Sequence, residues 1–372
     1  MHSSIKNEIS LAFLLGLATL IAVFFSITYF THLNAIQWLL FASGIWLFSC
    51  WQLWKRRELN RPTENAAPYP TLGLANRLTL LRGGLIALTG GFLFQPQAVS
   101  WAAWIPGLLY TLAAILDRMD GFVARRSKQT SLLGSELDTV YDALGLLVAP
   151  LLAVGYGKIH WSFLLVSVAY YIFMWGLHWR TTHNLAVYPL LPSMLRRTLA
   201  GFQMGFVALI LLPCFEAPLT TVIGIAFMLP ILVGFIVDWL VVSGRVLSTT
   251  NTTQFFDRLA QCSQIFFQPL LRAILCFTLL LLTSNDYHFS SVLLKCVLLA
   301  AGCMVLFGLA ARAGALVILI LVALAQNDNA VNIISAAIIF PSVWLMLLGS
   351  GRFSLWQWDD HWVNRRDGEE NV

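Results

Sequence analysis

The amino-acid sequence predicts an all-α, polytopic membrane helix bundle. Of its 372 residues, 58% are hydrophobic and only 11% are charged, whereas a soluble domain carries about 25% charged residues. The mean hydropathy is +0.75, and apolar runs long enough to cross a bilayer recur along the chain. Such runs are typical of membrane-spanning helices, because a helix satisfies its own backbone hydrogen bonds in lipid.

Twelve apolar runs are predicted to be transmembrane helices. They cover residues 10–31, 35–54, 77–96, 99–117, 137–156, 160–178, 198–214, 218–244, 266–283, 290–310, 313–325 and 331–349. The run at 313–325 is short, since a helix needs about 20 apolar residues to traverse the hydrocarbon core. The six cysteines are scattered without a C-x-x-C pair, so we interpret them as small apolar side chains and not as a zinc site or disulfide framework.

Basic residues gather in alternate gaps between the runs, which predicts the orientation of the chain. The gaps on the opposite side are poor in cations, with Lys158 as the exception. The positive-inside rule then places the cation-rich gaps and both termini at the cytoplasmic face. The net charge of +5 follows from this pattern and does not indicate a nucleic-acid partner. The cations are Lys55, Arg56, Arg57, Arg77, Arg82, Arg118 to Lys128, Arg180, Arg196, Arg197, Arg245, Arg312, Arg365 and Arg366.

Three segments follow from the distribution of polar residues. Residues 1–75 contain two apolar runs and a polar, proline-containing stretch (55–75) that we interpret as an interfacial linker. Residues 76–246 contain six runs. Residues 247–372 begin with a joint rich in Thr, Asn and Gln, "STTNTTQ", and continue with four runs and a polar tail.

The second segment holds an unusual group of acids. Asp117, Asp120, Gly121 and Ala124 are spaced so that they share one face of a helix, and Asp138 and Asp142 share a face of the next. The polar residues between Arg125 and Ser135 are enough for a turn. The sequence therefore predicts two antiparallel helices whose cytoplasmic ends direct four carboxylates at one another.

Four neighbouring carboxylates repel one another unless cations offset them. Divalent ions that prefer oxygen ligands (Mg²⁺, Mn²⁺ or Ca²⁺) would do so, and two such ions are suited to holding a pyrophosphate during displacement at phosphorus. Gly121 and Ala124 leave room for a flat base or sugar, and Arg125 offers a bidentate donor to phosphate.

The alternative is a set of ordinary interfacial acids paired with nearby cations. The candidate partners are Arg118, Arg125, Arg126 and Lys128. Glu136 falls outside the face shared by Asp138 and Asp142, so we assign it to solvent or to a salt bridge.

The spacing of these residues resembles the signature of the CDP-alcohol phosphotransferase (CDP-alcohol phosphatidyltransferase) family at all eight specified positions. The pattern is Asp117-x2-Asp120-Gly121-x2-Ala124-Arg125-x8-Gly134-x3-Asp138-x3-Asp142. The resemblance implies a six-helix catalytic core over residues 76–246. It also implies transfer of a substituted phosphate from a CDP-linked donor to an alcohol, with release of CMP.

The resemblance also implies a role for each signature residue. Asp117, Asp120 and Asp138 would ligate two divalent ions, Mg²⁺ or Mn²⁺. Asp142 would lie at the second ion and act as the base on the acceptor hydroxyl. Gly121, Ala124 and Gly134 would line the cytidine pocket, and Arg125 would support the phosphates or the acids.

Two further stretches resemble parts of the same family. "ANRLTLLR" (75–82) is similar to the P-N-x-L-T-x-x-R entry to its first span, with alanine for proline. Asn76, Thr79 and Arg82 are then candidates to bind the donor phosphate or to form the structural base of the site, the alternative being a helix cap and a snorkelling arginine. "PSMLRRTLAGFQ" (192–203) is a loose match to an acceptor segment, so Arg196 and Arg197 either grip an acceptor phosphate or are a plain positive-inside pair.

The C-terminal segment departs from that family. Its end, "LLGSGRFSLWQWDDHW" (347–362), resembles the close of DoxX-like four-span proteins. Asp359, Asp360 and His361 are either a metal-binding trio or part of a tryptophan-rich interfacial anchor. In the six-span block, Asp238 lies inside an apolar run, so it needs a partner such as Arg245.

Three functions remain open at this point. The first is phospholipid synthesis, in which the donor is CDP-diacylglycerol and the acceptor is an alcohol. The second is transfer from CDP-choline or CDP-ethanolamine to diacylglycerol, and the third is a non-enzymatic transporter or membrane scaffold. The first two and last four runs are candidates for stabilising a homodimer, delivering lipid or contacting a partner. The expected location is the bacterial inner (plasma) membrane.

Overall fold

The computed structural model is predominantly helical over the residues that it describes, which are 2–190, 194–246, 258–284, 292–325 and 333–364. The long helices are α1 (His2–Phe30), α2 (Ala35–Arg56), α3 (Gly73–Gly90), α4 (Ile105–Arg126), α5 (Leu132–Gly155), α6 (Leu164–Thr182), α7 (Met194–Ile210), α8 (Leu219–Val242), α10 (Gln268–Ser284), α11 (Val292–Phe307), α12 (Ala311–Ala325) and α13 (Ile333–Leu348). The predicted all-α class is confirmed. The "STTNTTQ" joint and the pair Arg365 and Arg366 lie outside the described residues.

Each predicted apolar run coincides with one of these helices, and several helices extend past the predicted ends. Within the described ranges, six helical segments are long and apolar enough to span a membrane: Ile5–Phe30, Ala35–Leu59, Leu132–Gly155, Trp161–Thr182, Leu219–Val242 and Arg258–Ser284. Helices α11, α12 and α13 are apolar but shorter. The chain is therefore a polytopic membrane protein, and the figure of twelve crossings stays a prediction.

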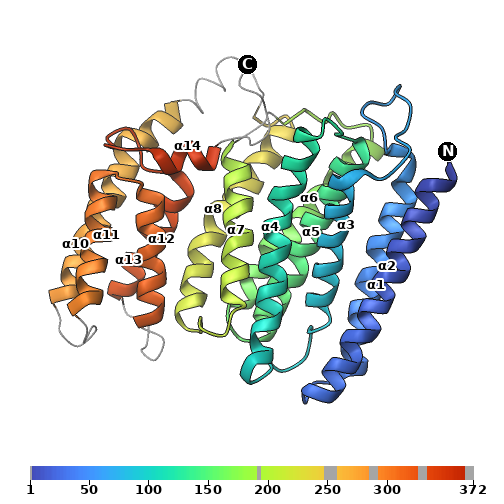
Figure 1. Cartoon of the computed structure of the whole chain (residues 1–372). Helices are drawn as coiled ribbons and strands as arrows, with labels where there is room; N and C mark the ends of the chain where they lie inside the picture. Colours follow the sequence, from blue (N-terminus) through green and yellow to red (C-terminus); the bar gives the residue numbers. More distant parts are fainter. Residues whose placement is uncertain (1, 191–193, 247–257, 285–291, 326–332, 365–372) are drawn as a thin grey trace. The chain divides into compact units, whose positions relative to one another are not determined.

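The chain divides into two compact units. The first contains residues 1–157 and 204–213, and the second contains residues 158–203 and 214–365. In the first unit α1 packs against α2, α2 against α3, and α3 against both α4 and α5 (Figure 1). Helix α3 therefore contacts both of the helices that carry the acidic signature.

A glycine at the end of α3 allows a tryptophan of α2 to lie close to the α3 backbone. A Cβ atom at Gly91, just after α3, would lie 2.4 Å from Nε1 of Trp38, and Trp38 is fully buried. The α5 side chain Tyr141 is also fully buried and donates a hydrogen bond to the Ser49 carbonyl of α2 at 3.1 Å. These contacts fix α2, α3 and α5 as one packed layer.

The predicted interfacial linker is docked on the first unit through Asn60. This side chain is fully buried and donates to the Thr71 carbonyl at 2.8 Å. Its own carbonyl accepts from the Tyr69 amide at 2.8 Å, and the next carbonyl, of Arg61, accepts from the Leu132 amide at 2.9 Å. The linker therefore contacts the start of α5 directly.

In the second unit α6 packs against α8, α8 against α13, and α10 to α13 pack against one another. Lys158, the exception to the charge pattern, is 3% exposed and donates to the Phe215 carbonyl at 2.7 Å. Burial lowers the pKa of its amine. A lysine held in this way is not a free loop cation, so it does not argue against the predicted orientation.

Candidate active site

The turn between α4 and α5 places the two acidic helix ends beside each other. Helix α4 ends in a Schellman motif, in which the Gln129 amide bonds to the Ala124 carbonyl at 3.1 Å and the Lys128 amide to the Arg125 carbonyl at 3.2 Å. Lys128 has the left-handed φ of 53° that this motif requires. Ser131 then caps α5 by accepting from the Gly134 amide at 3.0 Å. The helices therefore begin and end where local capping dictates.

Three of the four predicted carboxylates meet. One oxygen each from Asp117, Asp138 and Asp142 lies within 4.8 Å of the others. Their side chains are 29%, 46% and 41% exposed, so the cluster is open to solvent while its base is buried. The predicted convergence of α4 and α5 is confirmed for these three residues.

A single arginine of α3 lies at the base of this cluster. Nη1 of Arg82 is 2.6 Å from Asp117 and 2.8 Å from Asp138, and Nη2 contacts Asp142. The Arg82 side chain is completely buried, and its Nε has no hydrogen-bond partner among the described residues. One guanidinium thus faces three carboxylates, which leaves an excess of negative charge toward solvent.

Asp120 is held apart from this trio. It is 5% exposed and accepts a hydrogen bond from the Thr79 hydroxyl at 2.8 Å. Thr79 also donates to the Ala75 carbonyl of its own helix at 3.1 Å. The Thr79 hydroxyl of α3 therefore orients Asp120, whereas the other three signature aspartates form ion pairs with Arg82.

Asn76 joins three parts of the first unit below the acids. Its amide nitrogen donates to Asn60 of the linker at 3.0 Å, to the Leu72 carbonyl at 2.8 Å and to the Ser131 hydroxyl at 3.1 Å. A Cβ atom at Gly134 would lie 2.7 Å from the Asn76 side-chain oxygen. Gly134 therefore leaves space for Asn76, and the cytidine-binding role predicted for Gly134 stays a prediction.

The small residues of α4 have a different neighbour. A Cβ atom at Gly121 would lie 3.2 Å from Nη1 of Arg125, so the guanidinium lies across the backbone where the sequence predicts a nucleotide base. Gly121, Ala124 and Arg125 all remain partly exposed. Their predicted roles in binding cytidine and phosphate stay predictions.

The donor set fits a divalent ion of the Mg²⁺ or Mn²⁺ type. Asp117, Asp138 and Asp142 offer only hard carboxylate oxygens at short mutual distances, which are the ligands that these ions prefer. Asp120 points to Thr79 instead, so the structure supports three of the four predicted ligands as one group. The second ion stays a prediction.

Residues 72–242 match the sequence profile of the CDP-alcohol phosphatidyltransferase family. This span is a CDP-alcohol phosphatidyltransferase domain. The match covers the helices that carry all eight signature residues, over nearly the same range as the six-helix core predicted at 76–246.

Two curated relatives of the phosphatidyltransferase domain carry the same name, CDP-diacylglycerol–glycerol-3-phosphate 3-phosphatidyltransferase. The protein from Cereibacter sphaeroides is 34% identical over 108 residues, which is 28% of this chain and 48% of the relative. The protein from Pectobacterium atrosepticum is 38% identical over 84 residues, 23% of this chain and 45% of the relative. The chain therefore spans about half the length of the curated relatives it matches. No solved structure matches it.

The predicted acceptor residues of the phosphatidyltransferase domain belong to the second unit. Arg196 pairs with Asp238 at 3.4 Å, and Arg197 is exposed. Asp238 thus finds a partner as expected, but the partner is Arg196 and not the suggested Arg245. The acceptor role of Arg196 and Arg197 stays a prediction.

The acids after the phosphatidyltransferase domain are tied to the backbone of the C-terminal block. Asp359 accepts from the Arg312 amide at 2.7 Å, and Asp360 pairs with the Arg312 guanidinium at 2.6 Å and accepts from the Ser350 amide at 3.3 Å. The side chain of His361 lies outside the described residues. For the two aspartates, the structure favours a structural role over a metal trio.

The sequence suggests two roles for Arg82, binding of the donor phosphate or the structural base of the site, and the geometry fits the second. Arg82 is also one of the cations of the cytoplasmic gaps, but it is completely buried and pairs with the acid cluster. The signal for this pairing was present, because a charged residue inside an apolar run needs a partner. Glu136, by contrast, forms the expected salt bridge, to Arg56 at 3.4 Å.

Proposed function

We propose that this protein transfers a phosphatidyl group from CDP-diacylglycerol to an alcohol and releases CMP, as a step of phospholipid synthesis. One observation carries the proposal: a solvent-open trio of carboxylates around a buried arginine, inside a domain of this family. The names of the relatives support CDP-diacylglycerol as the donor.

In the proposed reaction Asp142 accepts the proton of the acceptor hydroxyl. The acceptor oxygen then forms a bond to the β-phosphorus, which carries the lipid, while the bond from this phosphorus to the bridging oxygen breaks and CMP leaves. A divalent ion held by Asp117, Asp138 and Asp142 would offset the charge of the pyrophosphate and of CMP. Positioning and charge stabilisation supply most of the rate in phosphoryl transfer.

Arg82 positions the carboxylates in the proposed reaction. It is completely buried, so it orients the carboxylates and does not reach the substrate. Its contacts to Asp117, Asp138 and Asp142 hold these side chains together before any ligand binds. Such preorganisation limits the reorganisation needed at the moment of reaction.

Glycerol 3-phosphate is the first acceptor to test, because the relatives carry it in their names. The segment around Arg196 and Arg197 departs from the acceptor pattern, and Arg196 is engaged with Asp238. Other alcohols therefore belong in the same assay.

The test measures CMP release by the purified full-length protein in nanodiscs that contain CDP-diacylglycerol, with Mg²⁺ or Mn²⁺ and each acceptor. We expect Asp142→Asn and Asp117→Asn each to lower release by about 10³-fold. The matched control is Glu136→Gln, which removes an acid of the same helix that pairs with Arg56 outside the cluster; it should retain activity.

Three results would contradict the proposal. Undiminished CMP release by Asp142→Asn would show that the carboxylate cluster does not catalyse the reaction. If labelled head group entered lipid only from CDP-choline or CDP-ethanolamine, the CDP-linked donor would be the head group and the acceptor would be diacylglycerol. Movement of a solute into vesicles without any release of CMP would favour a transporter.

We also propose that the site faces the cytoplasm of a bacterium, from the inner membrane. The cation pattern supports this orientation, and the relatives are bacterial. Labelling of cysteines placed at exposed Gln129 and exposed Trp161, in sealed vesicles of known orientation, would test it.

A further inference from the structure

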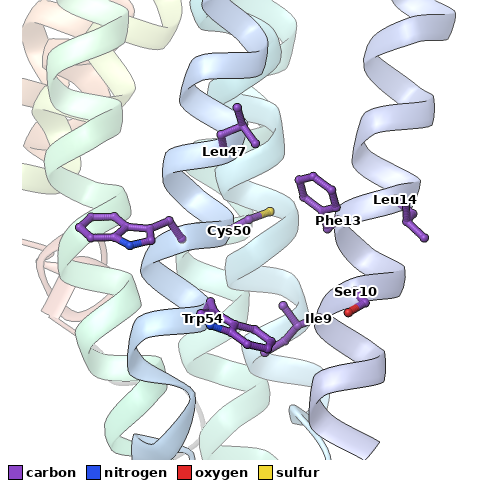
Figure 2. Close-up of a pocket in the computed structure, with 8 residues that line it drawn as sticks. Ile9, Ser10, Phe13, Leu14, Leu47, Cys50 and Trp54 are labelled. Atoms are coloured by element: carbon purple, nitrogen blue, oxygen red, sulfur yellow. The ribbon is translucent and has the colours of Figure 1, made fainter.

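The first two helices enclose an apolar groove away from the acid cluster. It has a volume of about 420 Å³ and is lined by Ile9, Ser10, Phe13, Leu14, Leu47, Cys50, Trp51 and Trp54. Figure 2 shows Phe13 and Ile9 of α1 directed toward Cys50 and Trp54 of α2. From Leu47 to Trp54 the wall of α2 covers about 10 Å, which is enough for a segment of an acyl chain.

The walls of this groove are exposed, although they are apolar. Leu14 is 58% exposed, and Leu47 and Trp51 are each 53% exposed. Both helices are apolar and long enough to span a membrane, so the groove opens toward lipid and not toward water. A hydrocarbon chain is the ligand that this lining fits.

Cations gather at one end of the groove. Nζ of Lys55 lies 5.3 Å from the ring centroid of Trp51, and the Arg57 guanidinium lies 4.6 Å from the ring of Trp54. Lys6 of α1 is exposed and lies one helical turn before the groove residues of α1. The same two tryptophans thus line the groove and contact a cation.

Acids near this end are outnumbered and are engaged. Residues 5–8 and 55–58 contain four basic and two acidic side chains. Glu8 pairs with Arg77 at 3.1 Å, and Glu58 pairs with Arg57 at 3.4 Å. Arg56 pairs with Glu136 at 3.4 Å. The charge left at the end of the groove is positive.

We propose that this groove binds an anionic diacyl phospholipid of the surrounding leaflet. One acyl chain lies between α1 and α2, and the phosphate lies beside Lys55 and Arg57. An apolar slot closed by cations complements a lipid of this class at both ends. This binding site is separate from the acid cluster and does not depend on the proposed reaction.

The first experiment uses the unaltered protein. Full-length protein is reconstituted in nanodiscs of phosphatidylcholine, and phosphatidylglycerol with brominated acyl chains is added in increasing amounts. Bromine quenches nearby indoles, so we expect a saturable quenching component at a low fraction of the anionic lipid. Brominated phosphatidylcholine should produce only gradual quenching, and equal curves for the two lipids would overturn the proposal.

The second experiment removes the cations and the indole. Lys55→Gln with Arg57→Gln should weaken the saturable component about 30-fold, because each cation near an anionic lipid is worth about fivefold in affinity. Trp54→Phe should reduce its amplitude. The matched control is Arg258→Gln with Arg352→Gln, which removes two exposed cations of the second unit. An equal loss in this control, or no loss in the groove variant, would contradict the proposal.

Discussion

Arg82 and Arg312 are both buried arginines that pair with aspartates, but the carboxylates around them differ in exposure. Around Arg82, the side chains of Asp138 and Asp142 are 46% and 41% exposed, and one guanidinium pairs with all three carboxylates of the trio. Around Arg312, the Asp360 side chain is 19% exposed, and both aspartates also accept backbone amides.

The difference separates a site that can bind a ligand from one that stabilises the fold. Carboxylates that already accept amides and a guanidinium have little capacity left for another cation. Three carboxylates that share one guanidinium keep free lone pairs and an excess of negative charge. The residue types are the same in the two clusters. The hydrogen-bond partners of each carboxylate oxygen distinguish them.

The largest expected effect contrasts Asp142 with Asp360. Asp142→Asn should lower CMP release by about 10³-fold, the order seen when one charge-stabilising group is removed from an active site. Asp360→Asn should leave the activity of folded protein within about twofold and cost roughly 1–3 kcal/mol of stability. Activity and melting curves of both variants decide this, and loss of activity in folded Asp360→Asn would erase the distinction.

The second prediction concerns the two arginines. Arg82→Gln leaves three carboxylates without their cation, so we expect a loss of about 3 kcal/mol and a melting temperature lower by roughly 6–12 °C. Added Mn²⁺ should restore much of that loss, because the ion replaces the missing charge. Arg312→Gln serves as the control: its destabilisation should not respond to Mn²⁺. Equal rescue of both variants would show nonspecific binding.

The third prediction ranks the acids of the phosphatidyltransferase domain by their contacts. Asp138→Asn should weaken Mn²⁺ binding by at least about tenfold, since it removes a carboxylate of the trio. Asp120→Asn should weaken it less, because Asp120 is bonded to Thr79. Titration of Mn²⁺ followed by electron paramagnetic resonance measures both. Equal losses would place Asp120 among the direct ligands, as the sequence analysis predicts.

The smallest expected effect tests the contact beneath the acids. Gly134→Ala would place a Cβ atom 2.7 Å from the Asn76 oxygen, so we expect a loss of about 1–3 kcal/mol. Gly155→Ala, at the other end of α5, meets nothing within 4 Å and should be neutral or stabilising by about 1 kcal/mol. Melting curves compare the two, and equal stability would show that Asn76 moves aside without cost.

Much of the fold follows from the sequence because lipid imposes simple rules. Apolar runs must be helices in a bilayer, and each predicted run coincides with one. The convergence of Asp117 with Asp138 and Asp142 also followed, since helical spacing and a short turn determine it. The end of α4 at Arg126 also followed, because the shared face of Asp117, Asp120 and Ala124 requires a helix to that point and the polar residues after Arg125 form the predicted turn.

What the sequence could not supply is the partner of each polar group. Arg82 is 35 residues from Asp117 in the chain, and only the packing of α3 against α4 and α5 brings them together. The exclusion of Asp120 from the trio depends on one Thr79 hydroxyl. These partners are determined by how the helices pack, and they leave no periodic pattern in the sequence.

The docking of Asn60 has a consequence for anyone who would isolate the catalytic core. A chain shortened to begin at Ala75 would contain every signature residue, yet it would lack the amide acceptor of Asn76 and the carbonyl that receives the Leu132 amide. Asn60 and Arg61 of the linker thus support Asn76 of α3 and the first residue of α5, and a chain without them would lose both hydrogen bonds.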